Sequence, residues 1–185
     1  VVDLKNKSSF ILPTPFHKHP FEFTVGFRSN YFIYFFAYFL TFMSISVDNF
    51  NLGIFSLILT LLSCLNYYTN SEDEFYVWVF SLTPKEFIRY KLKNIIQYST
   101  ILCLPIIISL SLFFYTKIDV IIGFLFLGYL FIFTTMLAKY SVFPEKLNIR
   151  FTIVLALTIW LPPLLLLIIP YLYIQSTKKL KEILQ

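Results

Sequence analysis

Long uncharged stretches dominate this sequence and restrict what it can fold into. Five of them, each of about 17 residues or more, contain no Asp, Glu, Lys or Arg: 31–47, 52–68, 95–116, 120–138 and 151–174. A helix of about 17 residues is roughly 26 Å long, which approaches the roughly 30 Å of a bilayer's hydrocarbon core. We therefore expect an all-α, polytopic helical membrane protein with four full spans at the first four stretches.

The composition leaves little room for a soluble domain. Hydrophobic residues make up 58% of the chain and charged residues 14%, whereas soluble domains average about 45–50% and about 25%. One core of a 185-residue chain cannot bury so much Phe, Ile and Leu, so the surplus is expected to face lipid. Only four glycines are present. This argues against flexible linkers, and we expect a single transmembrane domain at 31–185.

Lysine and arginine are distributed unevenly around the expected spans. Eleven of them lie in the segments 1–30, 70–93 and 139–150, and one lies in the turns 48–51 and 117–119. Cytoplasmic loops carry the excess of basic residues. The three basic segments are therefore expected inside the cell and the two turns outside.

The fifth stretch, 151–174, differs from the others because Pro162 and Pro163 interrupt its centre. It either crosses once as a kinked fifth span or turns back at the prolines as a re-entrant hairpin. Each half has about 12 residues and reaches about 18 Å, too short to cross alone. The basic tail at 175–185 favours re-entry, because a return keeps its lysines inside, whereas the total length favours crossing.

The first 30 residues combine basic and aromatic side chains. Pro13, Pro15 and Pro20 prevent a continuous helix before Phe21. An amphipathic segment of this kind is typical of the membrane interface, and a plain cytosolic loop is the alternative. The first residue is Val and not Met, which is compatible with a fragment that has further chain before Val1.

Two helix-start signals follow the second span. Ser71 and Glu74 match the capping box. Thr83 and Glu86 match it again, with proline at the first helical position. The pattern predicts two short helical pieces within 72–93, the second running without interruption into the third span. Its basic residues are expected at the membrane surface.

Several residues inside the spans carry local predictions. Gly123 and Gly128 predict a close approach of a neighbouring helix. Pro105 removes one backbone hydrogen bond and should bend the third span. Cys64 and Cys103 fall in apolar runs and are expected to be buried, unpaired thiols.

Neither a catalytic nor a metal-binding set of residues stands out, and we predict no enzyme activity, cofactor or metal. His17 and His19 have no Cys or Asp close by in the sequence. The spans contain no acid or base for ion coupling, so another chain must supply any energy. An intramembrane enzyme is the least expected function, because Thr134 and Thr135 lack a base and should bond to helix carbonyls. The basic residues form no continuous patch, and nucleic acid is not expected as a partner.

The run from Asp73 to Lys91, DEFYVWVFSLTPKEFIRYK, resembles the region after the second span of type-2 ATP-binding-cassette (ABC) exporter permeases. In that family an acidic start, an apolar turn, a proline and a lysine precede the third span. The layout is similar as well: an interfacial elbow, two spans, a cytoplasmic coupling helix and further spans. The family's sixth span is absent here, or reduced to half of the proline hairpin.

The resemblance implies that 13–28 form the elbow helix and 71–83 the coupling helix, which docks on a separate ATPase subunit. It also implies an exporter permease in the bacterial cytoplasmic (inner) membrane, a homodimer in contact with membrane lipid. The implied partner contacts are Glu72, Asp73, Glu74, Phe75, Trp78, Phe80, Pro84 and Lys85. The alternative is a non-transporting membrane scaffold or assembly protein, in which these capped helices only connect two spans.

Overall fold

The computed structural model describes residues 14–16, 21–69, 77, 79, 81–145 and 149–184. Within this part of the chain 88% of the residues are helical and no strand occurs. The prediction of an all-α protein is confirmed.

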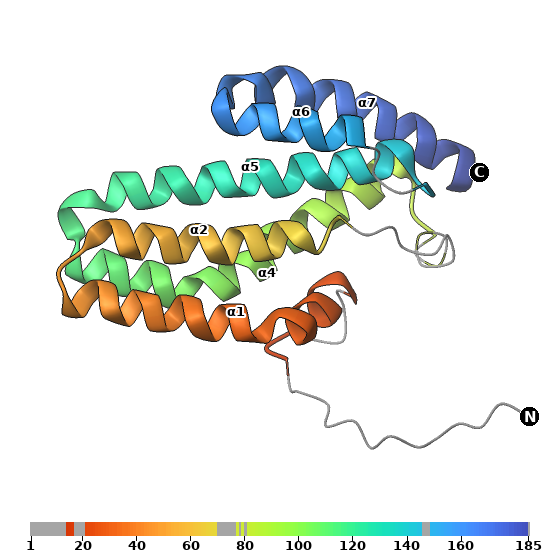
Figure 1. The fold of residues 1–185 in the computed structure, drawn as a ribbon. Coiled ribbons are helices and arrows are strands. Elements are labelled where there is room, and N and C mark those ends of the chain that lie inside the picture. The colour runs from red at the N-terminus through yellow and green to blue at the C-terminus, as the bar shows by residue number, and fades with distance from the viewer. Residues whose placement is uncertain are drawn as a thin grey trace, which may run out of the picture.

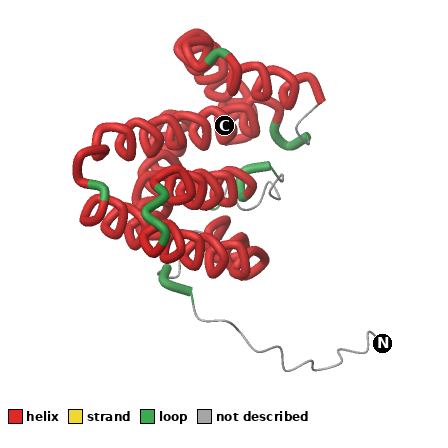
Figure 2. The backbone as a smooth tube through the Cα atoms, turned by 60° about the vertical axis from the view of Figure 1, so that its left-hand side comes forward, coloured by secondary structure: helices red, strands yellow, loops and turns green. Residues whose placement is uncertain are grey.

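Six α-helices and two short 3-10 helices make up the described chain (Figure 1). Their bounds are α1 Phe21–Ser46, α2 Phe50–Asn66, α4 Pro84–Phe113, η1 Tyr115–Lys117, α5 Ile118–Val142, α6 Ile149–Trp160, η2 Pro162–Leu164 and α7 Leu165–Leu184. Helices α1, α2, α4 and α5 alternate in direction and form a bundle, and α7 packs along α5. Figure 2 shows the bundle from a second direction, with the last two helices on one side of it.

Small residues allow the bundle helices to approach closely. A methyl group added at Gly128 of α5 would lie 2.5 Å from Leu61 Cδ1 of α2, and Gly53 of α2 is similarly close to Leu110 of α4. The predicted close approach is therefore confirmed at Gly128. At Gly123 it is wrong, because no atom lies within 4 Å of a methyl group added there. Five residues turn a helix by about 500°, so these two glycines face directions about 140° apart.

A tight turn joins α1 to α2, where the sequence predicted one. Asp48 adopts a φ of 52°. Asn49 caps α2, because its side chain accepts a hydrogen bond from the Leu52 amide at 3.3 Å. Ser44 Oγ donates to the Asn49 carbonyl at 2.8 Å. Helix α2 consequently begins at Phe50, slightly before the predicted span.

Helix α1 is interrupted at Asn30, whose φ of −121° and ψ of 16° are not helical. The segment before this point turns away from the axis of residues 31–46 (Figure 1, red against orange). The helix begins at Phe21, directly after the last proline, as proline geometry predicted. The rest of the predicted interfacial segment, 1–13 and 17–20, lies outside the described residues.

Helix α4 begins at its predicted capping box. The Glu86 carboxylate accepts hydrogen bonds from the Thr83 hydroxyl at 2.7 Å and from the Thr83 amide at 3.0 Å. These two bonds lower the pKa of the Glu86 carboxyl. From Pro84 the helix continues to Phe113 without a break, as predicted. The helix predicted before it falls mostly outside the described residues.

Within α4, Pro105 lacks the backbone donor that would bond to the preceding turn. The Tyr38 hydroxyl of α1 donates to the Leu102 carbonyl, one turn before the proline, at 2.9 Å. A neighbouring helix thus supplies a hydrogen bond to the backbone beside the proline, as helices packed in membranes commonly do.

The chain turns back after α6. The short helix η2 at Pro162–Leu164 joins α6 to α7, and these two helices run in opposite directions in Figure 1. Helix α7 packs along α5 and ends at the same end of the bundle as α5 does. The backbone therefore reverses at the prolines, and its depth in a bilayer stays a prediction.

Two helical segments of the described chain, Pro84–Phe113 and Tyr115–Val142, are long enough and apolar enough to cross a membrane. Helix α2 is apolar as well but has only 17 residues. For α1 and α2 a full crossing remains a prediction.

Candidate functional site

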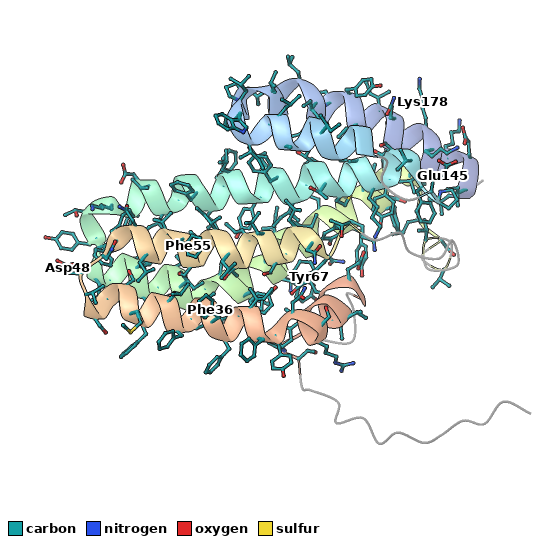
Figure 3. The ribbon with its side chains drawn as sticks, in the orientation of Figure 1. Phe36, Asp48, Phe55, Tyr67, Glu145 and Lys178 are labelled. Atoms are coloured by element: carbon teal, nitrogen blue, oxygen red, sulfur yellow. The ribbon has the colours of Figure 1, made fainter. Side chains whose placement is uncertain are left out.

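Charged side chains gather at the two ends of the bundle. Figure 3 shows Asp48 at one end, Glu145 and Lys178 at the other, and Phe36 and Phe55 between them. The lengths of the four bundle helices between these ends carry no charged residue. We call the second end the basic end, because it carries Lys85, Arg89, Lys93 and Lys178.

Large apolar side chains cover the outside of the uncharged lengths. Along α1, Phe32, Phe35, Phe39 and Phe42 are between 51% and 70% exposed. Each of the other α-helices also exposes large apolar side chains. Soluble monomers rarely expose contiguous apolar patches above a few hundred Å². This surface is therefore suited to hydrocarbon rather than to water.

A buried ion pair holds residues 21–28 against α4; these residues are the part of the predicted elbow helix that lies in α1, and we call them the elbow segment. The Lys91 ammonium contacts the Glu22 carboxylate, and the two side chains are 3% and 4% exposed. The ammonium also lies 5.3 Å from the centre of the Phe87 ring. The Lys91 side chain is thus buried against Glu22, and the expectation that the charges of α4 lie at the level of the membrane surface stays a prediction.

Aromatic rings surround the same junction. Phe16 packs edge to face on Phe23 and on Tyr98 of α4, with ring centres 5.8 and 5.4 Å apart. Phe23 meets Tyr67, which follows α2, at 5.4 Å. Gly26 leaves room for the Tyr67 ring, because a methyl group there would overlap it. The elbow segment, the end of α2 and α4 thus form one packed unit.

The end of α5 joins this unit through a buried lysine. Lys139 is 3% exposed, and its ammonium lies 5.7 Å from the centre of the Tyr68 ring and 5.4 Å from that of Tyr140. Cations over aromatic faces at such distances are attracted by the ring quadrupoles. Tyr140 packs in turn on Phe87 of α4, with ring centres 5.1 Å apart. All four bundle helices are therefore tied together at the basic end.

Most of the residues predicted to contact a partner lie outside the described part of the chain. These are Glu72, Asp73, Glu74, Phe75, Trp78 and Phe80. Pro84 lies in the first turn of α4, and Lys85 beside it is exposed. Val77 is fully buried, whereas Val79 is 51% exposed. Val77 is thus packed against the rest of the protein.

Several interior polar residues behave as the sequence predicted. Thr134 donates to the Leu130 carbonyl at 2.7 Å, and Thr135 donates to the Phe131 carbonyl at 2.9 Å. The cysteines at 64 and 103 are buried and form no disulfide. These groups are satisfied within their own helices or packed as small apolar side chains.

Sequence reasoning missed the pair of Glu22 and Lys91. One signal for it exists: Glu22 stands between two phenylalanines in a segment that is otherwise basic. An acid that is buried in such apolar surroundings is expected to pair with a buried cation. The sequence offers many lysines and arginines, however, and only the fold selects one of them.

A scan against models of protein families finds no match to this chain, and searches of curated proteins and of solved structures find none either.

Proposed function

We propose that this chain is the membrane-spanning permease subunit of an ABC-type exporter, driven by a separate ATPase that docks at the basic end. The observation that carries the proposal is the separation of charge. Two charged ends enclose uncharged helix lengths whose outer surface is apolar. In a bilayer this arrangement places the ends in water and the helices between them in hydrocarbon.

The proposal requires α1 and α2 to cross together with α4 and α5. Residues 31–46 and α2 are about 24 to 26 Å long, a few Å short of an average hydrocarbon core. Local thinning of the bilayer accommodates such a mismatch at fractions of a kcal/mol per Å. Four crossings then place the basic end in the cytoplasm, in keeping with its excess of lysine and arginine.

The hairpin of α6 and α7 is proposed to enter the membrane from the cytoplasm and return. Helix α6 has 12 residues, which reach about 18 Å and cannot cross. Re-entry also keeps Lys178, Lys179 and Lys181 on the cytoplasmic side, as the distribution of basic residues favours.

Docking of an ATPase at the basic end is supported by the segments that pack together there. The bent elbow segment, the end of α2 and the capped start of α4 lie together there, in the order known from type-2 exporters. One copy has too few spans to enclose a path easily, so we propose a homodimer. The resemblance places it in the bacterial cytoplasmic membrane.

Topology is tested with single added cysteines and a maleimide that does not cross membranes. The native thiols at 64 and 103 are buried, so they contribute little background. Asp48→Cys and Tyr115→Cys should react in intact cells, and Lys85→Cys and Lys178→Cys only after permeabilisation. Reaction of Lys178→Cys in intact cells would show a fifth crossing instead of re-entry. Reaction of Lys85→Cys would overturn the orientation.

The docking site is tested by the double variant Phe75→Asp with Trp78→Asp. It should lose co-purification with an ATPase that the unaltered chain retains from its native membrane. Tyr115→Asp is the matched control, because it exchanges an aromatic residue that is 72% exposed at the opposite end. If no ATPase accompanies the unaltered chain, the transport proposal fails and the scaffold alternative takes its place.

A further inference from the structure

An apolar groove runs between α2, α5 and the tip of α6. Its volume is about 360 Å³, within the range of sites that hold small ligands. Helix α2 lines it with residues that include Leu62, α5 with residues that include Phe124 and Phe131, and α6 with Ile159. Every lining residue is apolar or glycine.

The chemistry of this lining restricts what can occupy the groove. A polar ligand would lose its hydrogen bonds to water without replacement, at a cost of roughly 2–7 kcal/mol per group. Water is disfavoured for the same reason, and apolar cavities of about 150 Å³ remain dry and accept hydrocarbons. The occupant must therefore be a hydrocarbon.

The position of α6 supplies a second, independent observation. Among the described residues, the hairpin of α6, η2 and α7 contacts α5 chiefly through α7. At its tip Trp160 is 86% exposed and Ile159 65% exposed. The tip of α6 thus contributes the exposed side chain of Ile159 to the groove, beside the residues of α2 and α5.

We propose that one acyl chain of a membrane lipid lies in this groove and fills the space between the bundle and the tip of α6. The groove belongs to the uncharged lengths of α2 and α5, where lipid chains are the surrounding solvent. The inference rests on the membrane placement in the proposed function but not on transport. If the chain binds the lipid but no ATPase, this inference stands and the permease proposal fails.

The experiment uses phosphatidylcholine that carries a diazirine in one acyl chain. The full chain is reconstituted in phosphatidylcholine vesicles with a small fraction of this probe, illuminated, digested and mapped by mass spectrometry. Peptides with Leu62 and Ile159 should be labelled in excess over the peptide with Phe35, which is 70% exposed on α1.

Leu62→Trp fills the groove and should lower its labelling about tenfold, which corresponds to about 1.4 kcal/mol of binding free energy. Leu104→Trp is the matched control, because Leu104 is 45% and Leu62 51% exposed and Leu104 does not line the groove. Ile159→Trp fills the groove from the opposite wall if Leu62→Trp fails to fold.

Three results would overturn the inference. The first is labelling at the groove no greater than at Phe35. The second is groove labelling that Leu62→Trp and Ile159→Trp leave unchanged. The third is an unlabelled groove together with dimers that Leu62→Trp separates, since a second copy of this chain would then be the occupant.

Discussion

The buried pair of Glu22 and Lys91 offers the sharpest test of how the elbow segment is held. Glu22→Gln keeps the shape of the side chain but removes the carboxylate charge that lies against the Lys91 ammonium. Both side chains are almost fully buried, at 4% and 3% exposure. Breaking such a pair from one side costs about 3–5 kcal/mol, because the remaining charge stays in a medium that solvates it poorly.

The expected effect is measurable as a change in the unfolding temperature of the protein in detergent. For a chain of this size, 1 kcal/mol shifts Tm by about 2–4 °C. Glu22→Gln should therefore lower Tm by about 6–20 °C. Lys91→Met should act similarly, because it leaves the carboxylate buried without this ammonium.

The double variant Glu22→Met with Lys91→Met separates a lost pair from lost packing. Replacing both members of a buried pair by apolar residues is often neutral or stabilising by about 1–4 kcal/mol. Its Tm should therefore lie well above that of either single variant. Glu182→Gln is the surface control, because its pair with Lys179 is 66% and 42% exposed and contributes about 0–1 kcal/mol.

Two outcomes would refute this reasoning. A Tm for Glu22→Gln equal to that of Glu182→Gln would mean that the ion pair is not buried. A double variant as unstable as both single variants combined would mean that the two residues do not act as a pair.

Three further expectations concern single residues and are checked by Tm in detergent. Thr83→Ala should cost about 1 kcal/mol through the loss of the capping box. Because Thr83 lowers the pKa of the Glu86 carboxyl, the stabilisation by this cap is complete above the usual pKa of a free carboxyl. It is lost as the pH falls through the lowered pKa. Gly128→Ala should destabilise by about 1–3 kcal/mol by crowding α2, while Gly123→Ala, in open space, should be neutral or stabilise the helix by up to about 1 kcal/mol. Tyr38→Phe should cost about 0.6 kcal/mol and at most about 1.7 kcal/mol, the average and the largest value measured for hydrogen bonds between membrane helices, and an unchanged Tm would show that its bond to the α4 backbone does not form.

Local signals predicted much of the helical layout. The prolines before Phe21 predicted where α1 begins, and the capping box at Thr83 predicted where α4 begins. The uncharged runs predicted α5 close to its observed bounds. Each of these signals acts over one or two turns of chain, where backbone geometry and capping determine the outcome. At Pro162 and Pro163 the sequence predicted an interruption of the helix, but it left a kinked crossing and a reversal both open, and only the structure shows the reversal.

The contacts at the basic end were beyond such reasoning. Lys91 and Lys139 look like surface residues in the sequence, yet both are buried at 3% exposure. Their burial depends on a carboxylate from another helix in one case and on the rings of Tyr68 and Tyr140 in the other. The break at Asn30 has no proline or glycine at that residue, and the segment before it packs against α4.

Glu22 and Lys91 lie 69 positions apart in the sequence, and this separation has a consequence for biosynthesis. At about 5–20 residues per second, roughly 3–14 s pass between the synthesis of the acid and that of its cation. Helices α1 and α2 are synthesised during this interval, while the carboxylate has nothing from α4 to meet. A ribosome-bound chain that stops short of position 91 should therefore leave the first turn of α1 open to protease, and a chain long enough for Lys91 to have left the ribosome should protect that turn.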